Sequence, residues 1–262
     1  MNQHNSIHFT DDDLLYITAL NENQMINVIA CLDLSNLTTR LNQKWSKVIE
    51  SSKGNYQLLS ILIDENELYL NYKSTHVYDS FTHGTILGFM KFELMTVQQL
   101  WANGFQYNKT FVDSSKTFIS EFDILKNSDS QIEYLGICSH TQKNNETDYW
   151  MEFSLMQANS SRGQKDIKFT EIQVEQRCRD VKMQNSQEFL AVTSLNIGST
   201  ISLVIYQISF INSTKVSIVQ TSVTYSGFIQ TLHAMIMDDN GIIYSGSDNG
   251  YPRTSSVVNT NN

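Results

Sequence analysis

An aromatic residue returns about every 55 residues along this chain, each time in the same local setting. Each copy lies in a short apolar run and is followed two positions later by a smaller or polar residue. The five copies are Tyr16, Tyr69, Tyr134, Phe189 and Tyr244. A period of this size is the signature of a repeat architecture, in which each repeat is one supersecondary unit packed on its neighbours. The period therefore constrains the fold more than any other feature.

Each repeat has the pattern of four short strands, which we name A to D. Strand A is followed by a turn rich in Asn, Asp and Ser and then by the aromatic strand B, which predicts a β-hairpin. Strand C alternates apolar and polar residues, as in Phe92-Glu93-Leu94, and strand D contains Trp45 and Trp101 in the first two repeats. Short segments rich in β-branched and aromatic residues favour strands over helices. The predicted A strands are 6–10, 58–63, 118–125, 178–183 and 232–237.

Four antiparallel strands per repeat predict an all-β fold, a β-propeller whose blades bury both faces of each sheet. The small residues Gly136, Ala191 and Gly246 suit a position where blades crowd together. The fifth repeat stops after strand B, so we expect about four and a half blades. Residues 1–262 would then be one propeller domain, or a piece of a longer protein that continues beyond Asn262. The expected blades are 6–51, 56–108, 116–175, 178–226 and the incomplete 230–262.

Several short motifs carry a family resemblance. They are Asp64 to Asn71, Gly88 to Leu94 with Trp101, and Asp238 to Gly246. This pattern resembles the propeller repeats of secreted bacterial and protist proteins, and the resemblance covers nearly the whole chain. Blades three and four depart from it because strand D lacks the tryptophan. The resemblance implies a fold whose members are scaffolds, surface proteins and a few enzymes, so no catalytic residues are transferred.

Charge and hydropathy exclude two classes of partner. The net charge is −9 and no Lys/Arg cluster is present, which argues against binding to nucleic acid or to an anionic membrane. The most apolar stretch, Ile201 to Ile211, is too short and polar to span a bilayer. Met1 to Thr10 is polar and shows no secretory leader, so we expect either an intracellular protein or a chain that begins after a removed leader.

The cysteines and histidines give no metal or cofactor motif. Cys31, Cys138 and Cys178 form no C-x-x-C pair, and the simplest expectation is three small reduced hydrophobic residues; one disulfide with an odd thiol is the alternative. His76, His83 and His140 are expected in solvated B–C loops, and no two of the six histidines share a strand face at i and i+2. Phosphate-binding, nucleophile-elbow and zinc-protease motifs are absent, so we predict no cofactor and no metal. Asp11-Asp12-Asp13 is expected to be a solvated turn.

Three carboxylates are candidates for chemistry. Glu121, Asp123 and Asp180 lie on or beside predicted A strands, which line the channel of a propeller. A glycan-cleaving enzyme needs two converging carboxylates, and such a pair is the feature to look for. No second motif in the sequence supports a site at these positions.

Five N-x-S/T sequons all fall in predicted loops, and three of them occupy the same C–D turn in different blades. They are Asn36, Asn108, Asn145, Asn159 and Asn212. Asn and Ser populate turns for conformational reasons alone. The alternative is that these are glycosylation sites of a secreted protein.

The leading functional hypothesis is a non-catalytic scaffold or protein-interaction domain within a larger secreted or cell-surface protein or assembly. Its partners would be other proteins, further blades of the same polypeptide or copies of itself, with no nucleic acid and no membrane insertion. One alternative is a propeller enzyme or lectin that acts on glycans. Another is a subunit of an intracellular assembly.

Overall fold

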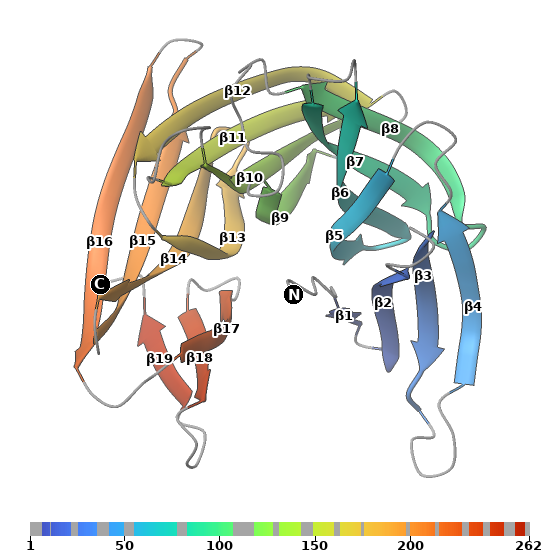
Figure 1. The fold of residues 1–262 in the computed structure, drawn as a ribbon, viewed down its shortest axis with the longest axis horizontal. Coiled ribbons are helices and arrows are strands. Elements are labelled where there is room, and N and C mark those ends of the chain that lie inside the picture. Colours follow the sequence, from blue (N-terminus) through green and yellow to red (C-terminus); the bar gives the residue numbers. More distant parts are fainter. Residues whose placement is uncertain are drawn as a thin grey trace. The chain divides into compact units, whose positions relative to one another are not determined.

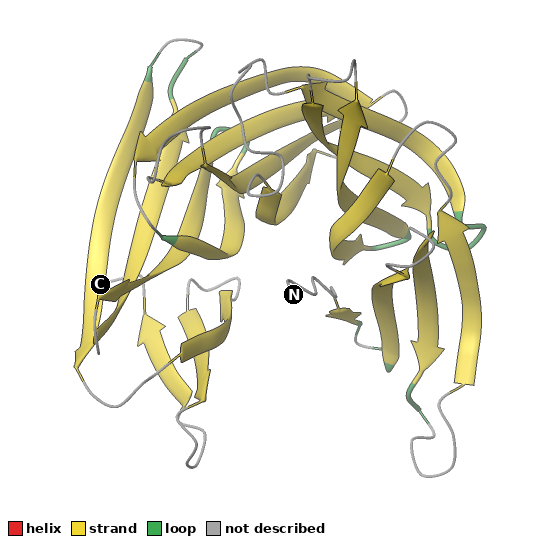
Figure 2. Ribbon diagram, viewed as in Figure 1, coloured by secondary structure: helices red, strands yellow, loops and turns green. Residues whose placement is uncertain are grey.

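The structure is a computed structural model, and it contains only strands, turns and short connections in the residues it describes (Figure 2). None of those residues form a helix that could cross a membrane. The described residues are 7–10, 12–21, 26–35, 42–49, 55–77, 83–106, 118–127, 131–142, 149–159, 163–173, 176–197, 200–212, 215–226, 231–237, 242–248 and 255–259.

The described strands form four sheets of four strands and one of three (Figure 1). Neighbours in each sheet follow one another in the chain, and the described pairs are antiparallel. We call each sheet a blade. Blade one is β1 (Ile7–Phe9), β2 (Leu14–Asn21), β3 (Ile26–Asp33) and β4 (Asn42–Ile49); blade two is β5 (Asn55–Asp64), β6 (Glu67–Val77), β7 (His83–Glu93) and β8 (Gln98–Gln106). Blade three is β9 (Phe118–Asn127), β10 (Ile132–Gln142), β11 (Tyr149–Asn159) and β12 (Gly163–Gln173); blade four is β13 (Arg177–Asn185), β14 (Glu188–Ile197), β15 (Thr200–Phe210) and β16 (Val216–Ser226). Blade five is β17 (Thr231–Met237), β18 (Ile242–Asp248) and β19 (Ser255–Asn259).

The chain divides into two compact units. The first is Met1–Ile119 with Ser161–Gly163 and contains blades one and two; the second is Ser120–Ser160 with Gln164–Asn262 and contains blades three to five. The expectation that blade five ends after strand B is wrong, because β19 pairs with β18 from Ile242↔Asn259 to Gly246↔Ser255. The C-terminal residues are mostly polar and therefore give no strand pattern in the sequence, although the backbone of β19 pairs with β18.

The recurring aromatic begins a row of packed side chains across blades one and two. In blade one Tyr16 pairs with Cys31 and Cys31 with Trp45, and the rings of Tyr16 and Trp45 lie 6.1 Å apart. Blade two repeats this geometry with Tyr69 and Trp101, whose ring centroids are 6.4 Å apart. Directly opposite residues on one sheet face are the units of side-chain packing in a sheet. The aromatic period is thus a core feature, as predicted.

Lys91 lies between Tyr69 and Trp101 in blade two and is fully buried. Its ammonium group lies 2.7 Å from Glu67 and 5.2 Å from the centre of the Tyr69 ring. The Tyr69 hydroxyl donates to Glu67 at 2.8 Å. A buried ammonium group is tolerated only with such an anion and aromatic face beside it.

The A–B turns are built alike in three blades. The backbone N–H near the end of strand C donates to a carbonyl in the A–B turn, from Leu34 to Asp13 (2.9 Å) and from Leu94 to Asn66 (2.8 Å). Blade four has the same bond from Phe210 to Gln187 at 2.8 Å. Asp13 has a positive φ of 60°, a conformation that Asp and Asn tolerate better than most residues. The Asn- and Asp-rich segments of the sequence therefore form the tight A–B turns that they predict.

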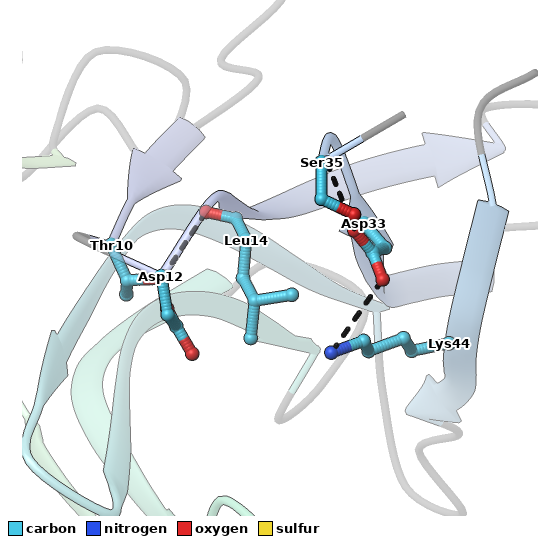
Figure 3. A network of polar contacts seen from close by, with 6 residues as sticks. All are labelled: Thr10, Asp12, Leu14, Asp33, Ser35 and Lys44. Carbon is cyan, nitrogen blue, oxygen red and sulfur yellow. Dashed lines mark hydrogen bonds and ion pairs between the residues drawn. The ribbon is translucent and has the colours of Figure 1, made fainter. Parts of the chain in front are cut away.

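Polar side chains complete the turns of blade one (Figure 3). The Thr10 hydroxyl hydrogen-bonds to Asp12, which is exposed, as expected for a solvated turn. Asp33 accepts from the backbone N–H of Ser35 at 3.0 Å and from its hydroxyl at 2.6 Å, and these bonds lower the pKa of Asp33. Lys44 lies 3.8 Å from Asp33. Such an exposed ion pair adds little stability, so the turn depends on the hydrogen bonds.

Three histidines lie in strands rather than in the loops where they were expected. His76 is in β6, His83 begins β7 and His140 is in β10. The strands extend further than their apolar segments, because backbone pairing continues through polar residues at the strand ends. In the described part of the chain, no group of three or more His, Cys, Asp or Glu residues is placed to hold a metal ion.

Gly136 lies at a close approach between blades three and four. A Cβ atom on Gly136 would lie 2.7 Å from Sδ of Met183 and 2.9 Å from Cγ of Phe189. Phe189 is fully buried, so its ring has little room to move. This bears out the expectation that a small residue stands here because the blades crowd together.

Replacing Gly136 with Ala is expected to lower the free energy of unfolding by about 1–3 kcal/mol, because overpacking displaces buried neighbours. Urea unfolding measures the change. The same substitution in a Met183→Ala background should cost less, since part of the clash is gone. An equal cost in both backgrounds would contradict the close contact.

Candidate functional site at the junction of blades three and four

Blades three and four, both in the second unit, are joined by a backbone hydrogen bond to a carboxylate. Asp123 on β9 accepts from the backbone N–H of Met183 on β13 at 2.8 Å. A comparable bond joins blades one and two, where the Asn27 side chain accepts from the N–H of Leu58 at 3.1 Å. Asp123, a candidate for chemistry in the sequence, thus helps to hold β13 against β9.

A disulfide forms a second link. Cys138 on β10 and Cys178 on β13 are bonded, with Cα atoms 6.3 Å apart and 40 residues between them in sequence. Cys31 is free and buried. The expectation of three reduced cysteines is wrong, and the alternative of one disulfide with an odd thiol is correct. The pairing follows from blade packing, which brings strand B of one repeat beside strand A of the next.

The strand after Cys178 is irregular. The register of β13 against β14 shifts between Cys178 and Asp180, which leaves Arg179 as an extra residue in the ladder. The guanidinium Nε of Arg179 donates to the Ser194 hydroxyl at 2.9 Å, and one Asp180 oxygen accepts from the backbone N–H of Val181 at 2.9 Å. Bulges re-aim side chains and are enriched beside active sites.

Similar shifts occur in strand A of two other blades. They lie between Leu58 and Ser60 in β5 and between Leu232 and Ala234 in β17. In blade two the shift is closed by Asn71, which accepts from the N–H of Ser60 at 2.9 Å and donates to its hydroxyl at 2.6 Å. A register shift is therefore a repeated feature of strand A. In blade four the shift includes two charged residues, Arg179 and Asp180.

Glu121 on β9 is the strongly perturbed acid of this junction. The pKa of Glu121 is raised to about 8: burial is the largest cause, the negative charge of Asp180 adds to the rise, and the positive charge of Arg179 opposes it. The side chain keeps partial exposure, and no hydrogen bond reaches its carboxyl group within the part of the chain that the structure describes. A perturbed carboxyl with a charged partner marks a candidate functional site.

Chemically, this arrangement offers a carboxylic acid that stays protonated at neutral pH beside an aspartate. When two carboxyl groups lie near each other, their environments decide which one keeps its proton. The protonated group can then act as the acid and the ionised group as the base or nucleophile. Glu121 and Asp180 were both candidates from the sequence, and the structure brings them within electrostatic reach. Arg179 was missed, because a bulge is set by strand register and leaves no mark in the sequence.

The sequons are only partly described. Asn212 is exposed in the turn between β15 and β16, where its side chain accepts from the backbone N–H of Lys215 at 2.9 Å. Asn159 was expected in a loop, but it is the last residue of β11 and is partly buried. Asn36, Asn108 and Asn145 lie outside the described residues.

Comparison with known proteins gives likeness in structure alone. No family model and no curated protein sequence matches the chain. The structure is similar to the crystal structure of an exo-β-1,3-galactanase from Phanerochaete chrysosporium with β-1,3-galactotriose, with a TM-score of 0.50 and 10% identity. That match covers 93% of this chain and 56% of the galactanase chain, so the protein spans about half of that enzyme's length. A GH43 endo-arabinanase from Bacillus licheniformis matches at a TM-score of 0.49 and 10% identity, over 98% of this chain and 92% of the arabinanase.

The fold is that of an all-β β-propeller built from four-stranded antiparallel blades, as the repeat pattern predicts. At 10% identity, the likeness defines the fold and assigns no activity. The narrower resemblance to secreted bacterial and protist propeller repeats stays a prediction.

Proposed function

We propose that this protein is a glycan-acting propeller enzyme that hydrolyses glycosidic bonds at the junction of blades three and four. The observation that carries the proposal is the raised pKa of Glu121, about 8, beside the charged pair Asp180 and Arg179. This reverses the leading hypothesis from the sequence, which was a non-catalytic scaffold. The sequence alone held candidate carboxylates but gave no sign that any two were coupled.

In this proposal Glu121 is the general acid. Its proton passes to the glycosidic oxygen as the bond to the anomeric carbon breaks, so the departing sugar leaves as a neutral alcohol. Asp180 is the second carboxylate, which either attacks the anomeric carbon or takes a proton from the attacking water. One water is consumed for each bond cleaved. Retained product configuration assigns Asp180 as nucleophile, and inverted configuration assigns it as base.

The fold comparison supports the choice of substrate class without fixing the substrate. The similar galactanase structure holds β-1,3-galactotriose, which makes the polymer of the same linkage, β-1,3-galactan, the first substrate to test. The test is reducing-end release from β-1,3-galactan, arabinan and β-glucan by the purified protein. Cleavage of at least one polymer is expected, and absence of cleavage of all three under neutral conditions would reject the enzyme.

A scaffold remains the second candidate, and Asp123 favours it. Its carboxylate lies on strand A but accepts from the backbone of the next blade, so this acid contributes to cohesion between blades. A scaffold would leave the polymers uncleaved and would still form a stable complex with other chains in native mass spectrometry. The two candidates therefore give opposite results in the same pair of experiments.

Secretion is part of the proposal. A disulfide such as Cys138–Cys178 persists in oxidising compartments and is rare in reducing ones, which favours a secreted or cell-surface protein over an intracellular assembly subunit. The exposed sequon at Asn212 is compatible with such a location.

We predict that Asn212 carries a glycan when the protein is made in a eukaryotic secretory pathway, because the side chain is exposed in a turn. Asn159 should be occupied less, since it ends a strand and is partly buried. Peptide mass spectrometry after enzymatic deglycosylation in heavy-oxygen water measures both sites. An unmodified Asn212 in material from the native source would contradict the glycosylated form of the proposal.

A further inference from the structure

A hollow of about 120 Å³ lies in the second unit, where blade three faces the A–B turn of blade four. Its walls come from strands B, C and D of blade three and from the β13–β14 turn. The lining residues are Tyr134, Leu155, Gln157, Asp166, Lys168, Ser186 and Gln187. Tyr134 is the recurring aromatic of this blade, and it lies near the β9–β10 turn. Glu121 lies toward the other end of β9, so the hollow and Glu121 lie at different ends of the junction between blades three and four.

The hollow lies in a blade that lacks the strand D tryptophan. In blades one and two a tryptophan from strand D packs beside the recurring tyrosine. Blade three has no tryptophan in β12, and β12 instead brings Asp166 and Lys168 to the hollow. Gln157 stands directly opposite Tyr134 in the β10–β11 register. Polar groups therefore lie near Tyr134 in blade three, whereas blades one and two pack an indole ring beside the recurring tyrosine.

Most of these polar side chains make no hydrogen bond or ion pair with another described residue. Among the described residues, no hydrogen bond or ion pair involves the side chains of Tyr134, Gln157, Lys168, Ser186 and Gln187. Asp166 accepts from the backbone N–H of Ile167 at 2.9 Å. Convergent polar groups beside an aromatic ring are a feature of binding sites for small molecules.

The donor and acceptor set selects the class of ligand. Lysine only donates, aspartate only accepts, and the amides and hydroxyl groups do both. Hydroxyl groups on a ligand match such a mixed set, because each hydroxyl donates once and accepts as well. The negative charge of Asp166 repels an anionic ligand and the positive charge of Lys168 repels a cationic one, so a neutral ligand is favoured over either. Tyr134 adds an aromatic ring to the lining, and aromatic rings can stack on the C–H face of a sugar.

We infer that this hollow, which we call the blade-three groove, binds a neutral sugar unit of a polyhydroxylated chain. The inference stands apart from the proposed hydrolysis, since the groove would hold a glycan whether or not Glu121 cleaves one. Binding here would keep a polymer on the protein at a place other than the Glu121 end of the junction.

The test is an NMR titration of the isotopically labelled full chain carrying Glu121→Gln, which prevents cleavage and leaves the groove intact. Probes are the neutral trisaccharides β-1,3-galactotriose, arabinotriose, cellotriose and maltotriose, with trigalacturonic acid and the chitosan trimer as charged comparisons. We expect at least one neutral probe to shift the amide signals of Lys168, Ser186 and Gln187 at millimolar concentration, and to bind more tightly than both charged probes.

Variants place the binding in the groove. Gln157→Ala and Gln187→Ala should each lower the affinity for the neutral probe by about three- to tenfold, which corresponds to the loss of one hydrogen bond. Gln220→Ala, an exposed glutamine of β16 outside the groove, is the matched control and should change nothing. Failure of all four neutral probes, tighter binding of a charged probe, or unchanged binding by both groove variants would each overturn the inference. Hydrolysis is measured separately on the wild-type chain, so either idea can fail alone.

Discussion

Replacing Glu121 with Gln is expected to lower the rate of glycoside cleavage by about 10²–10⁴-fold while the protein stays folded. Glutamine has nearly the same shape as the protonated acid but cannot deliver a proton to the leaving oxygen. The rate is measured by reducing-end release from whichever polymer the wild-type protein cleaves. A substrate with an activated leaving group should recover part of the rate, because its departure needs no proton.

Glu188→Gln is the matched control for this variant. Glu188 is a strand glutamate like Glu121, but it lies on β14 of blade four, where it accepts a hydrogen bond from Gln207 on the neighbouring strand. The control should keep the wild-type rate. If the Glu121→Gln variant cleaved the polymer at the wild-type rate, Glu121 would not be the general acid.

The same variant should stabilise the protein at neutral pH. The pKa of Glu121 rises from its ordinary value of 4.5 to about 8 in the folded state, so the folded protein holds a proton that the unfolded chain releases. The free energy of unfolding therefore falls as the pH rises from about 4.5 to 8. Glutamine mimics the neutral acid and so removes this decrease in the free energy of unfolding. The decrease at neutral pH is on the order of 3 kcal/mol for a partly exposed group. Urea unfolding at several pH values measures the difference.

Removing the disulfide is the second large effect. The double variant Cys138→Ala with Cys178→Ala is expected to lose about 4 kcal/mol of unfolding free energy. A cross-link over 40 residues restricts the unfolded chain by roughly that amount in the chain-entropy account. The bridge also ties β13 to blade three directly beside Arg179 and Asp180, so its loss should loosen the position of both charges.

Chemical reduction gives an independent check. Dithiothreitol should lower the stability of the wild-type protein to that of the double variant and leave the double variant unchanged. Cys31→Ala should keep the full sensitivity to dithiothreitol, because Cys31 is a free thiol. Wild-type protein whose stability is insensitive to reduction would contradict the bridge.

The fold was predictable because its determinants are local and repeated. Turn residues such as Asp13, with its positive φ, and aromatics such as Tyr69 act within one hairpin, where sequence and structure are directly linked. The third strand of blade five escaped prediction because β19 is only five residues long, with two apolar residues in a polar tail, and pairs with β18 through its backbone. Backbone pairing depends little on side-chain type.

The site was predictable only in part, because its determinants lie between blades. Glu121 and Asp180 were visible as acids near strand A, but their coupling needs β9 and β13 side by side. Cys138 and Cys178 pair for the same reason. Arg179 enters the junction through a register shift, which arises from the pairing of two whole strands.

The central claim is that Glu121 and Asp180 act as a coupled acid pair. A carbon-13 NMR titration of the Glu121 side-chain carboxyl tests it most directly, in the wild-type protein and in Asp180→Asn. We predict a pKa of about 8 in the wild type and a lower value when the charge of Asp180 is removed. A Glu121 carboxyl that titrates near 4.5, or one that does not respond to Asp180→Asn, would contradict the account.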